Sequence, residues 1–116
     1  MRYFCTYDQL DFATNSTNYL QIHWGPHGAH RFWAKDSLYI SGDVFNRICG
    51  MKLLCRSGAL LQFDFYDDTV VTQSDWDRMR EVLSSLGGEP AEFVAELSEW
   101  VGNGFDSFDC FTIVGV

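Results

Sequence analysis

The three histidines of this chain lie within eight residues, at positions 23, 27 and 30. Imidazole nitrogens are good zinc ligands, and the HxxxHxxH spacing would place them on one helix face if this stretch were helical. The intervening glycines and proline break a helix, and no cysteine or carboxylate follows closely enough to complete a zinc shell. We therefore expect no metal, and interpret the stretch as a loop between two strands that can gain charge between roughly pH 5 and 8. Its residues form a secondary candidate for partner contact: His23, His27, His30 and Trp33.

Aspartates between positions 64 and 77 form a second group with possible chemistry. Paired carboxylates bind magnesium or act as general acid and base, so a small metal-dependent hydrolase is one alternative. The group matches no EF-hand or Walker motif, and the chain has no GxSxG or GxGxxG sequence. We therefore expect no catalytic residue and no cofactor, and predict a binding surface in which two aromatic residues are the anchors. The predicted contact residues are Asp64, Tyr66, Asp67, Asp68, Asp75, Trp76 and Asp77.

The net charge of −8 is unevenly distributed along the chain. Residues 1–60 carry six basic and four acidic side chains, whereas residues 61–116 carry two basic and twelve acidic ones. A negative field repels nucleic acid and anionic lipid, and it attracts cationic proteins. We therefore expect a basic protein partner and no direct binding of nucleic acid or membrane. The alternative is an acidic face that serves only solubility.

Several short strands are expected to position these residues. Apolar and polar residues alternate over residues 17–24 and again over 59–72, as in half-buried strands. Residues 2–7 are β-prone and are expected to pair with residues 17–24 in a hairpin, and residues 31–40 to contain one or two further strands. Asp43 can cap a short helix over residues 44–52.

The C-terminal third has the clearest periodicity. Helical spacing of apolar residues predicts one helix after Ser74 that ends at Gly87 and a second over residues 90–101. Residues 108–116 are aromatic and β-branched, which predicts a final buried strand. The expected fold is a single α+β domain over residues 1–116, with a mostly antiparallel sheet, two C-terminal helices packed on it and a last strand.

The cysteines and the apolar runs bear on the cellular compartment. The first residues lack the apolar run of a signal peptide, and no stretch approaches the roughly 20 apolar residues that span a membrane. The four cysteines occur in apolar settings without a CxxC pair, so we interpret them as buried thiols. These features lead us to expect a cytoplasmic protein.

These properties together resemble those of immunity proteins, which protect bacteria from secreted toxins such as those of contact-dependent growth inhibition. The resemblance covers the character of the whole chain, a small acidic aromatic-rich α+β domain without catalytic motifs, and involves no sequence motif. It implies an inhibitor that neutralises a cationic toxin domain, often a nuclease, by occluding its active site. A phage-encoded antagonist of a host nucleic-acid-processing enzyme is the alternative within the same class of inhibitors.

Overall fold

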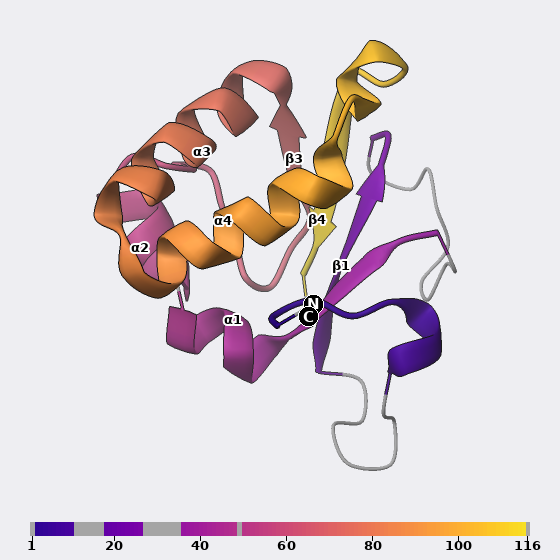
Figure 1. Ribbon diagram of the computed structural model, residues 1–116, viewed down its shortest axis with the longest axis horizontal. Coiled ribbons are helices and arrows are strands. Elements are labelled where there is room, and N and C mark those ends of the chain that lie inside the picture. Colours follow the sequence, from indigo (N-terminus) through magenta and orange to yellow (C-terminus); the bar gives the residue numbers. More distant parts are fainter. Residues whose placement is uncertain (1, 11–17, 27–35, 49, 116) are drawn as a thin grey trace.

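The computed structural model describes residues 2–10, 18–26, 36–48 and 50–115, which together form a four-stranded antiparallel sheet with helices on one face (Figure 1). Every pair of neighbouring strands in the sheet is antiparallel. The C-terminal strand lies in the interior of the sheet, between the first and third strands. In the sheet order β2-β1-β4-β3, the strands are β2 Leu38–Ser41, β1 Tyr19–Trp24, β4 Cys110–Val114 and β3 Thr69–Thr72.

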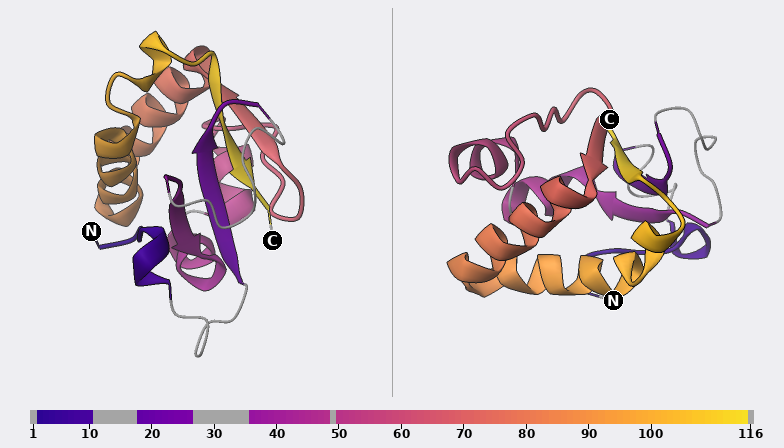
Figure 2. Two further views of the ribbon diagram at one scale, coloured as in Figure 1. Left: turned by 90° about the vertical axis from the view of Figure 1, so that its right-hand side faces the viewer. Right: turned by 90° about the horizontal axis from the view of Figure 1, so that it is seen from above.

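Two long helices cover one face of this sheet, as Figure 2 shows from the side. They pack against each other along their length and connect β3 to β4. This arrangement confirms the predicted α+β domain with two C-terminal helices and a final strand. The helices are α1 Gly42–Ile48, α2 Gly50–Arg56, α3 Gln73–Leu86 and α4 Gly88–Val101, and short 3-10 turns occupy Tyr7–Gln9 and Gly104–Asp106.

The core forms between the sheet and the helices because strand side chains alternate between faces. Ile22 of β1 lies opposite Leu38 of β2 and Ile113 of β4, so all three project toward the same side. Apolar stripes of α3 and α4 meet this face and exclude water from it. The main contributors from the two helices are Trp76, Met79, Leu83, Phe93, Val94 and Leu97.

The other face of β1 differs from the prediction, because its polar side chains are buried as well. Gln21 and His23 alternate with the core residues, yet both are almost inaccessible to solvent. The Gln21 amide donates to the Ser37 hydroxyl at 2.9 Å, and His23 Nδ1 lies 3.0 Å from the Trp24 carbonyl oxygen. Buried polar groups are stable when they are hydrogen-bonded, so the period-2 pattern here marks a polar interior and not a solvated face.

The predicted hairpin between residues 2–7 and 17–24 is wrong. The N-terminal segment meets the sheet at β2 instead, through one antiparallel bridge in which Cys5 and Tyr39 exchange backbone hydrogen bonds of 2.8 and 2.9 Å. The backbone N–H groups just before this bridge donate to the Glu96 carboxylate of α4. They are therefore not available for a strand ladder.

The strand predicted over residues 59–72 is confirmed only at Thr69–Thr72. Residues 59–68 form turns, in which Leu60 and Phe63 are buried while Leu61 is 65% exposed. Aspartate side chains in this segment bond to nearby backbone amides and so compete with strand pairing. The helix predicted over residues 44–52 is confirmed at residues 44–48 in α1 and 50–52 in α2, and residue 49 lies outside the described residues.

Candidate partner-binding surface

The predicted acidic contact residues centre on a fixed turn at residues 64–68, here called the acidic turn. Asp64 Oδ1 accepts a hydrogen bond from the Tyr66 amide at 2.9 Å, and Asp67 Oδ1 accepts one from the Asp68 amide at 2.8 Å. The Asp64 amide in turn donates to the Thr69 hydroxyl at 3.2 Å, which ties the turn to β3. Aspartate favours such turns because its short side chain reaches nearby backbone amides. The same carboxylates that shape the turn therefore give it its surface charge.

Large apolar side chains are exposed in and beside the acidic turn. Tyr66 is 76% exposed, and its ring packs edge-on against Phe65 with centroids 5.2 Å apart. Leu61 is 65% exposed and precedes the turn, while Val70 follows it on β3 and is partly exposed. Apolar side chains beside charged ones are typical of protein-binding surfaces. The predicted role of Tyr66 as an anchor is compatible with this position.

The acidic turn lies against the residue that follows β4. A Cβ atom built on Gly115 would lie 2.5 Å from both the amide nitrogen and the carbonyl oxygen of Asp67, and 2.8 Å from the Phe65 carbonyl oxygen. Real Cβ atoms essentially never approach backbone atoms so closely. Gly115 therefore permits a contact between two backbone segments that any other residue would obstruct.

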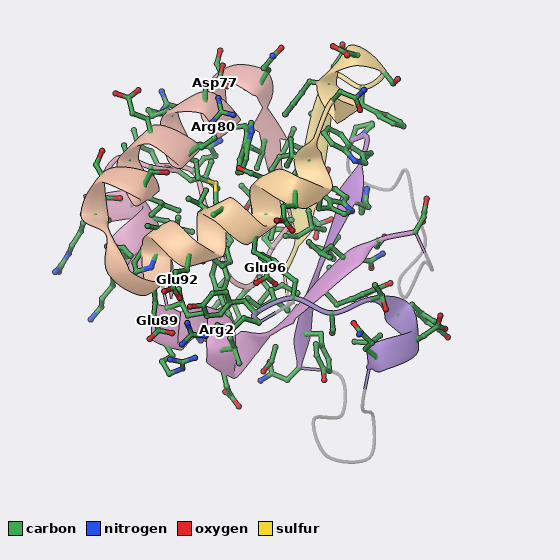
Figure 3. The ribbon with its side chains drawn as sticks, in the orientation of Figure 1. Arg2, Asp77, Arg80, Glu89, Glu92 and Glu96 are labelled. Carbon is green, nitrogen blue, oxygen red and sulfur yellow. The ribbon has the colours of Figure 1, made fainter. Side chains whose placement is uncertain are left out.

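Asp75 lies in the first turn of α3 and Asp77 lies just after it, and the two residues differ in their contacts. Asp75 accepts hydrogen bonds from the Thr72 amide at 3.1 Å and the Thr72 hydroxyl at 3.0 Å, forming a capping box at the helix start. It also accepts from Gln62 at 3.1 Å and pairs with Arg78 at 2.9 Å. Asp77 is exposed and pairs with Arg80 at 3.4 Å (Figure 3). The Gln62 bond brings the start of α3 next to the segment that leads into the acidic turn.

Trp76 is not an exposed anchor, and this part of the prediction is wrong. Its side chain is 3% exposed, and its ring packs against Phe111 of β4 with centroids 6.0 Å apart. The helical spacing from Trp76 to Met79 and Leu83 places all three on the buried face of α3. This periodicity was visible in the sequence and favours a core position over a surface one.

Only one of the three histidines lies within the residues that the structure describes. His23 lies within β1 and is 1% exposed, so the prediction that it belongs to a partner-facing loop is wrong for this residue. His27, His30 and Trp33 lie outside the described residues. Among residues 2–10, 18–26, 36–48 and 50–115, no three His, Cys, Asp or Glu side chains converge where they could hold a metal ion.

Three of the four cysteines can be placed, and all three are free thiols. Burial raises the pKa of the Cys5 thiol and of the Cys110 thiol, and for Cys110 the nearby Asp109 carboxylate adds to this effect. A raised pKa disfavours the reactive thiolate. The prediction of buried thiols is confirmed for Cys110, whereas Cys5 and Cys55 are only partly buried and Cys49 lies outside the described residues.

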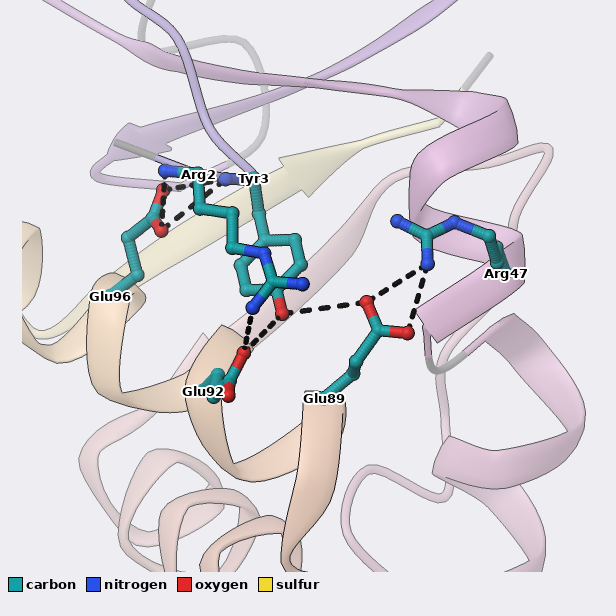
Figure 4. Close-up of polar contacts among 6 residues, drawn as sticks. All are labelled: Arg2, Tyr3, Arg47, Glu89, Glu92 and Glu96. Carbon is teal, nitrogen blue, oxygen red and sulfur yellow. Dashed lines mark hydrogen bonds and ion pairs between the residues drawn. The ribbon is translucent and has the colours of Figure 1, made fainter.

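A second group of carboxylates was not singled out from the sequence. Glu89, Glu92 and Glu96 form a row along α4 that faces the N-terminal segment (Figures 3 and 4). Glu96 accepts three consecutive backbone N–H groups, from Arg2 at 2.9 Å, Tyr3 at 3.0 Å and Phe4 at 2.8 Å. The only sequence signal is the 89, 92, 96 spacing, which places these side chains on one helix face without indicating what they meet.

The other two carboxylates of this row bind side chains. Glu92 accepts from the Tyr3 hydroxyl at 2.7 Å and pairs with the Arg2 guanidinium, while Glu89 pairs with Arg47 of α1 at 2.9 Å (Figure 4). Burial of the Tyr3 hydroxyl, together with its bond to Glu92, raises the pKa of Tyr3 to about 12. The row is thus occupied by the chain itself, whereas Asp64, Tyr66 and Asp67 of the acidic turn have exposed side chains.

No family model, curated protein or solved structure matches this chain. Within the described residues, no helix is both long and apolar enough to cross a membrane. Evidence on function therefore comes from the two clusters of carboxylates in this chain, the acidic turn and the row on α4.

Proposed function

We propose that this protein is an inhibitory binding protein: an immunity protein that neutralises a cationic toxin domain, a nuclease, by occluding its active site. The observation that carries the proposal is the exposed Tyr66 side chain on a hydrogen-bonded turn between Asp64 and Asp67. A rigid turn with an aromatic anchor and flanking charge binds at a low conformational entropy cost.

The chemistry of a nuclease active site fits this surface. Such a site holds phosphate groups with lysine and arginine side chains, which also attract the carboxylates of the acidic turn. Asp67 and Asp68 would occupy the positions of phosphate charges, and Tyr66 with Leu61 would fill an apolar contact beside them. Asp75 stabilises the start of the adjoining helix α3 and adds negative charge beside the acidic turn. Because such a toxin meets nucleic acid in the cytoplasm, the inhibitor would act there.

The proposal predicts that a toxin domain is encoded next to the gene for this chain, and the test uses that domain. Its nuclease activity is measured against increasing amounts of the wild-type protein, and stoichiometric inhibition is expected. Tyr66→Ala and the double variant Asp67→Lys/Asp68→Lys should each raise the concentration needed for half inhibition by tenfold or more, as expected for a hot-spot anchor and for like-charge repulsion.

A matched control reverses two exposed acids, Asp106 and Asp109, which precede β4, whereas the acidic turn lies against Gly115, which follows it. Asp106→Lys/Asp109→Lys changes the net charge by the same amount and should leave inhibition within about twofold of wild type. Inhibition that is equally weakened by both double variants would indicate only a general charge effect. Absence of inhibition by the wild-type protein would contradict the proposed function itself.

A further inference from the structure

Residues 2–6, here called the N-terminal strap, are held by elements far away in the sequence. The strap bends at Tyr3 and lies along α4 and the outer edge of β2 (Figures 1 and 4). The surface that receives it, here called the strap groove, is built by residues of these two elements: Tyr39, Glu89, Glu92, Phe93 and Glu96.

The strap groove binds main-chain atoms of the strap. Glu96 accepts the amides of Arg2, Tyr3 and Phe4, and the backbone of Tyr39 exchanges two hydrogen bonds with Cys5. Four consecutive residues are thus fixed through backbone groups that every non-proline residue has. Main-chain bonds of this kind provide affinity for a bound segment and set its register. The bridge to Tyr39 resembles the addition of a segment to a sheet edge, and the three amides that converge on Glu96 resemble a backbone anion nest.

Side-chain contacts make the strap groove selective. The buried Phe4 ring stacks on Phe93 of α4 with centroids 5.1 Å apart. The Tyr3 hydroxyl donates to Glu92, and the Arg2 guanidinium lies 5.2 Å from the centre of the Tyr3 ring while it pairs with Glu92. A basic residue followed by two aromatic residues satisfies all of these contacts at once.

The elements that form the strap groove have their own support. β2 is paired with β1, and α4 packs along α3. Glu89 is additionally held by Arg47 of α1. None of these contacts involves the strap, so the groove keeps its shape when the strap is exchanged for another segment.

We propose that the strap groove is a peptide-binding site for a segment in which a basic residue precedes two aromatic residues, and that residues 2–6 are its resident, autoinhibitory occupant. This inference is independent of the proposed toxin inhibition, which uses the acidic turn. A tethered occupant competes at an effective concentration in the millimolar range. An external segment therefore binds measurably only when the strap is weakened or when the partner adds contacts elsewhere.

The probe is the peptide acetyl-Arg-Tyr-Phe-Ser-Thr with a fluorophore at its C-terminus, in which serine replaces Cys5. Its fluorescence anisotropy is measured with full-length chains. Phe4→Ala weakens the strap and leaves every groove residue in place, so saturable binding is expected. Binding to the wild-type chain should be at least tenfold weaker because the intact strap competes.

Two further variants, both made in the Phe4→Ala chain, test the carboxylates. Glu92→Gln/Glu96→Gln should weaken peptide binding at least tenfold, because neutral amides replace the charged acceptors. Glu99→Gln is the matched control, since it neutralises an exposed acid of the same helix and should leave binding unchanged. A second peptide with glutamate for arginine and alanine for phenylalanine should not bind.

Circular dichroism establishes that each variant is folded. If Phe4→Ala does not fold, Tyr3→Phe replaces it, because this variant keeps the ring and loses only the hydroxyl contacts to Glu92 and Glu89. The chains that carry Tyr3→Phe must then bind the peptide in the same order of affinity. Failure of the peptide to bind a folded strap variant, or equal binding to the wild-type and Gln variants, would overturn the proposal.

Discussion

At the scale of single residues, the aspartates of the acidic turn shape the backbone and also charge the surface. One carboxylate oxygen of Asp64 and one of Asp67 bond to amides two and one residues onward. Gly115 completes this local structure from the other side, because only a residue without Cβ fits against the backbone of Asp67. The position of Tyr66 therefore depends on a glycine almost fifty residues away along the chain.

Replacing Gly115 by alanine should displace the acidic turn. The added Cβ would lie 2.5 Å from backbone atoms of Asp67, which cannot move without the turn. We expect a loss of about 1–3 kcal/mol in the free energy of unfolding, together with shifted amide resonances of Tyr66 and Asp67 in NMR spectra. Gly87→Ala is the control: its φ of 66° is itself unfavourable for alanine, but its Cβ would meet no atom within 4 Å, so the turn resonances should not shift. Unshifted turn resonances in Gly115→Ala would contradict the close contact.

The Tyr3 hydroxyl should make stability depend on alkaline pH. Its pKa is raised from 10.0 to about 12 in the folded state, mainly by burial and then by the bond to Glu92. Between these values the unfolded chain has lost the proton and the folded chain retains it, so the stabilisation present below pH 10 is lost as the pH rises toward 12. Urea unfolding over this window should show a shallower decline for Tyr3→Phe than for wild type. Equal declines in the free energy of unfolding of the two proteins would rule out a contribution from the Tyr3 hydroxyl.

At the scale of elements, α3 connects the core to the proposed surface. Thr72 ends β3 and caps α3, and the Asp75 carboxylate closes the capping box. The helix ends at Gly87, whose φ of 66° is a conformation that glycine adopts readily. These two ends fix the helix so that Trp76 faces the sheet and Asp77 faces solvent.

Asp75 and Asp77 should therefore respond differently to mutation. Asp75→Ala removes the carboxylate half of the capping box and the bonds to Gln62 and Arg78, and we expect a loss of about 1–2 kcal/mol in the free energy of unfolding. Asp77→Ala removes only an exposed pair with Arg80 and should change stability by less than about 0.5 kcal/mol. Urea denaturation measures both. Similar losses in the free energy of unfolding for the two variants would show that the capping box does not stabilise the fold more than the exposed ion pair does.

At the scale of the whole molecule, the sequence predicted those elements whose pattern is decided locally. The two C-terminal helices have long apolar stripes and glycine at their ends, and the last strand is almost entirely β-branched or aromatic. The fold class followed from these elements. The predicted ends of the elements were less accurate: the N-cap of α3 is Thr72 and not Ser74.

What the sequence could not predict depends on contacts between distant segments. Alternation in β1 does not reveal that both faces of the strand are covered, so His23 was expected at the surface. The β-prone N-terminal segment gives no sign that Glu96, more than ninety residues away, binds its amides. Binary patterning identifies elements, whereas the groups that meet across the molecule are set by tertiary packing.

We propose that the acidic turn binds the toxin domain, and the rate constant of association between the two proteins is the most sensitive test of this contact. Electrostatic steering accelerates association at low salt and is screened as ionic strength rises. Stopped-flow measurements at low salt should give a rate constant at least tenfold lower for Asp67→Lys/Asp68→Lys than for wild type, and the difference should shrink as salt is added. Asp106→Lys/Asp109→Lys should retain most of the wild-type rate. An unchanged rate for the reversed acidic turn would contradict the account.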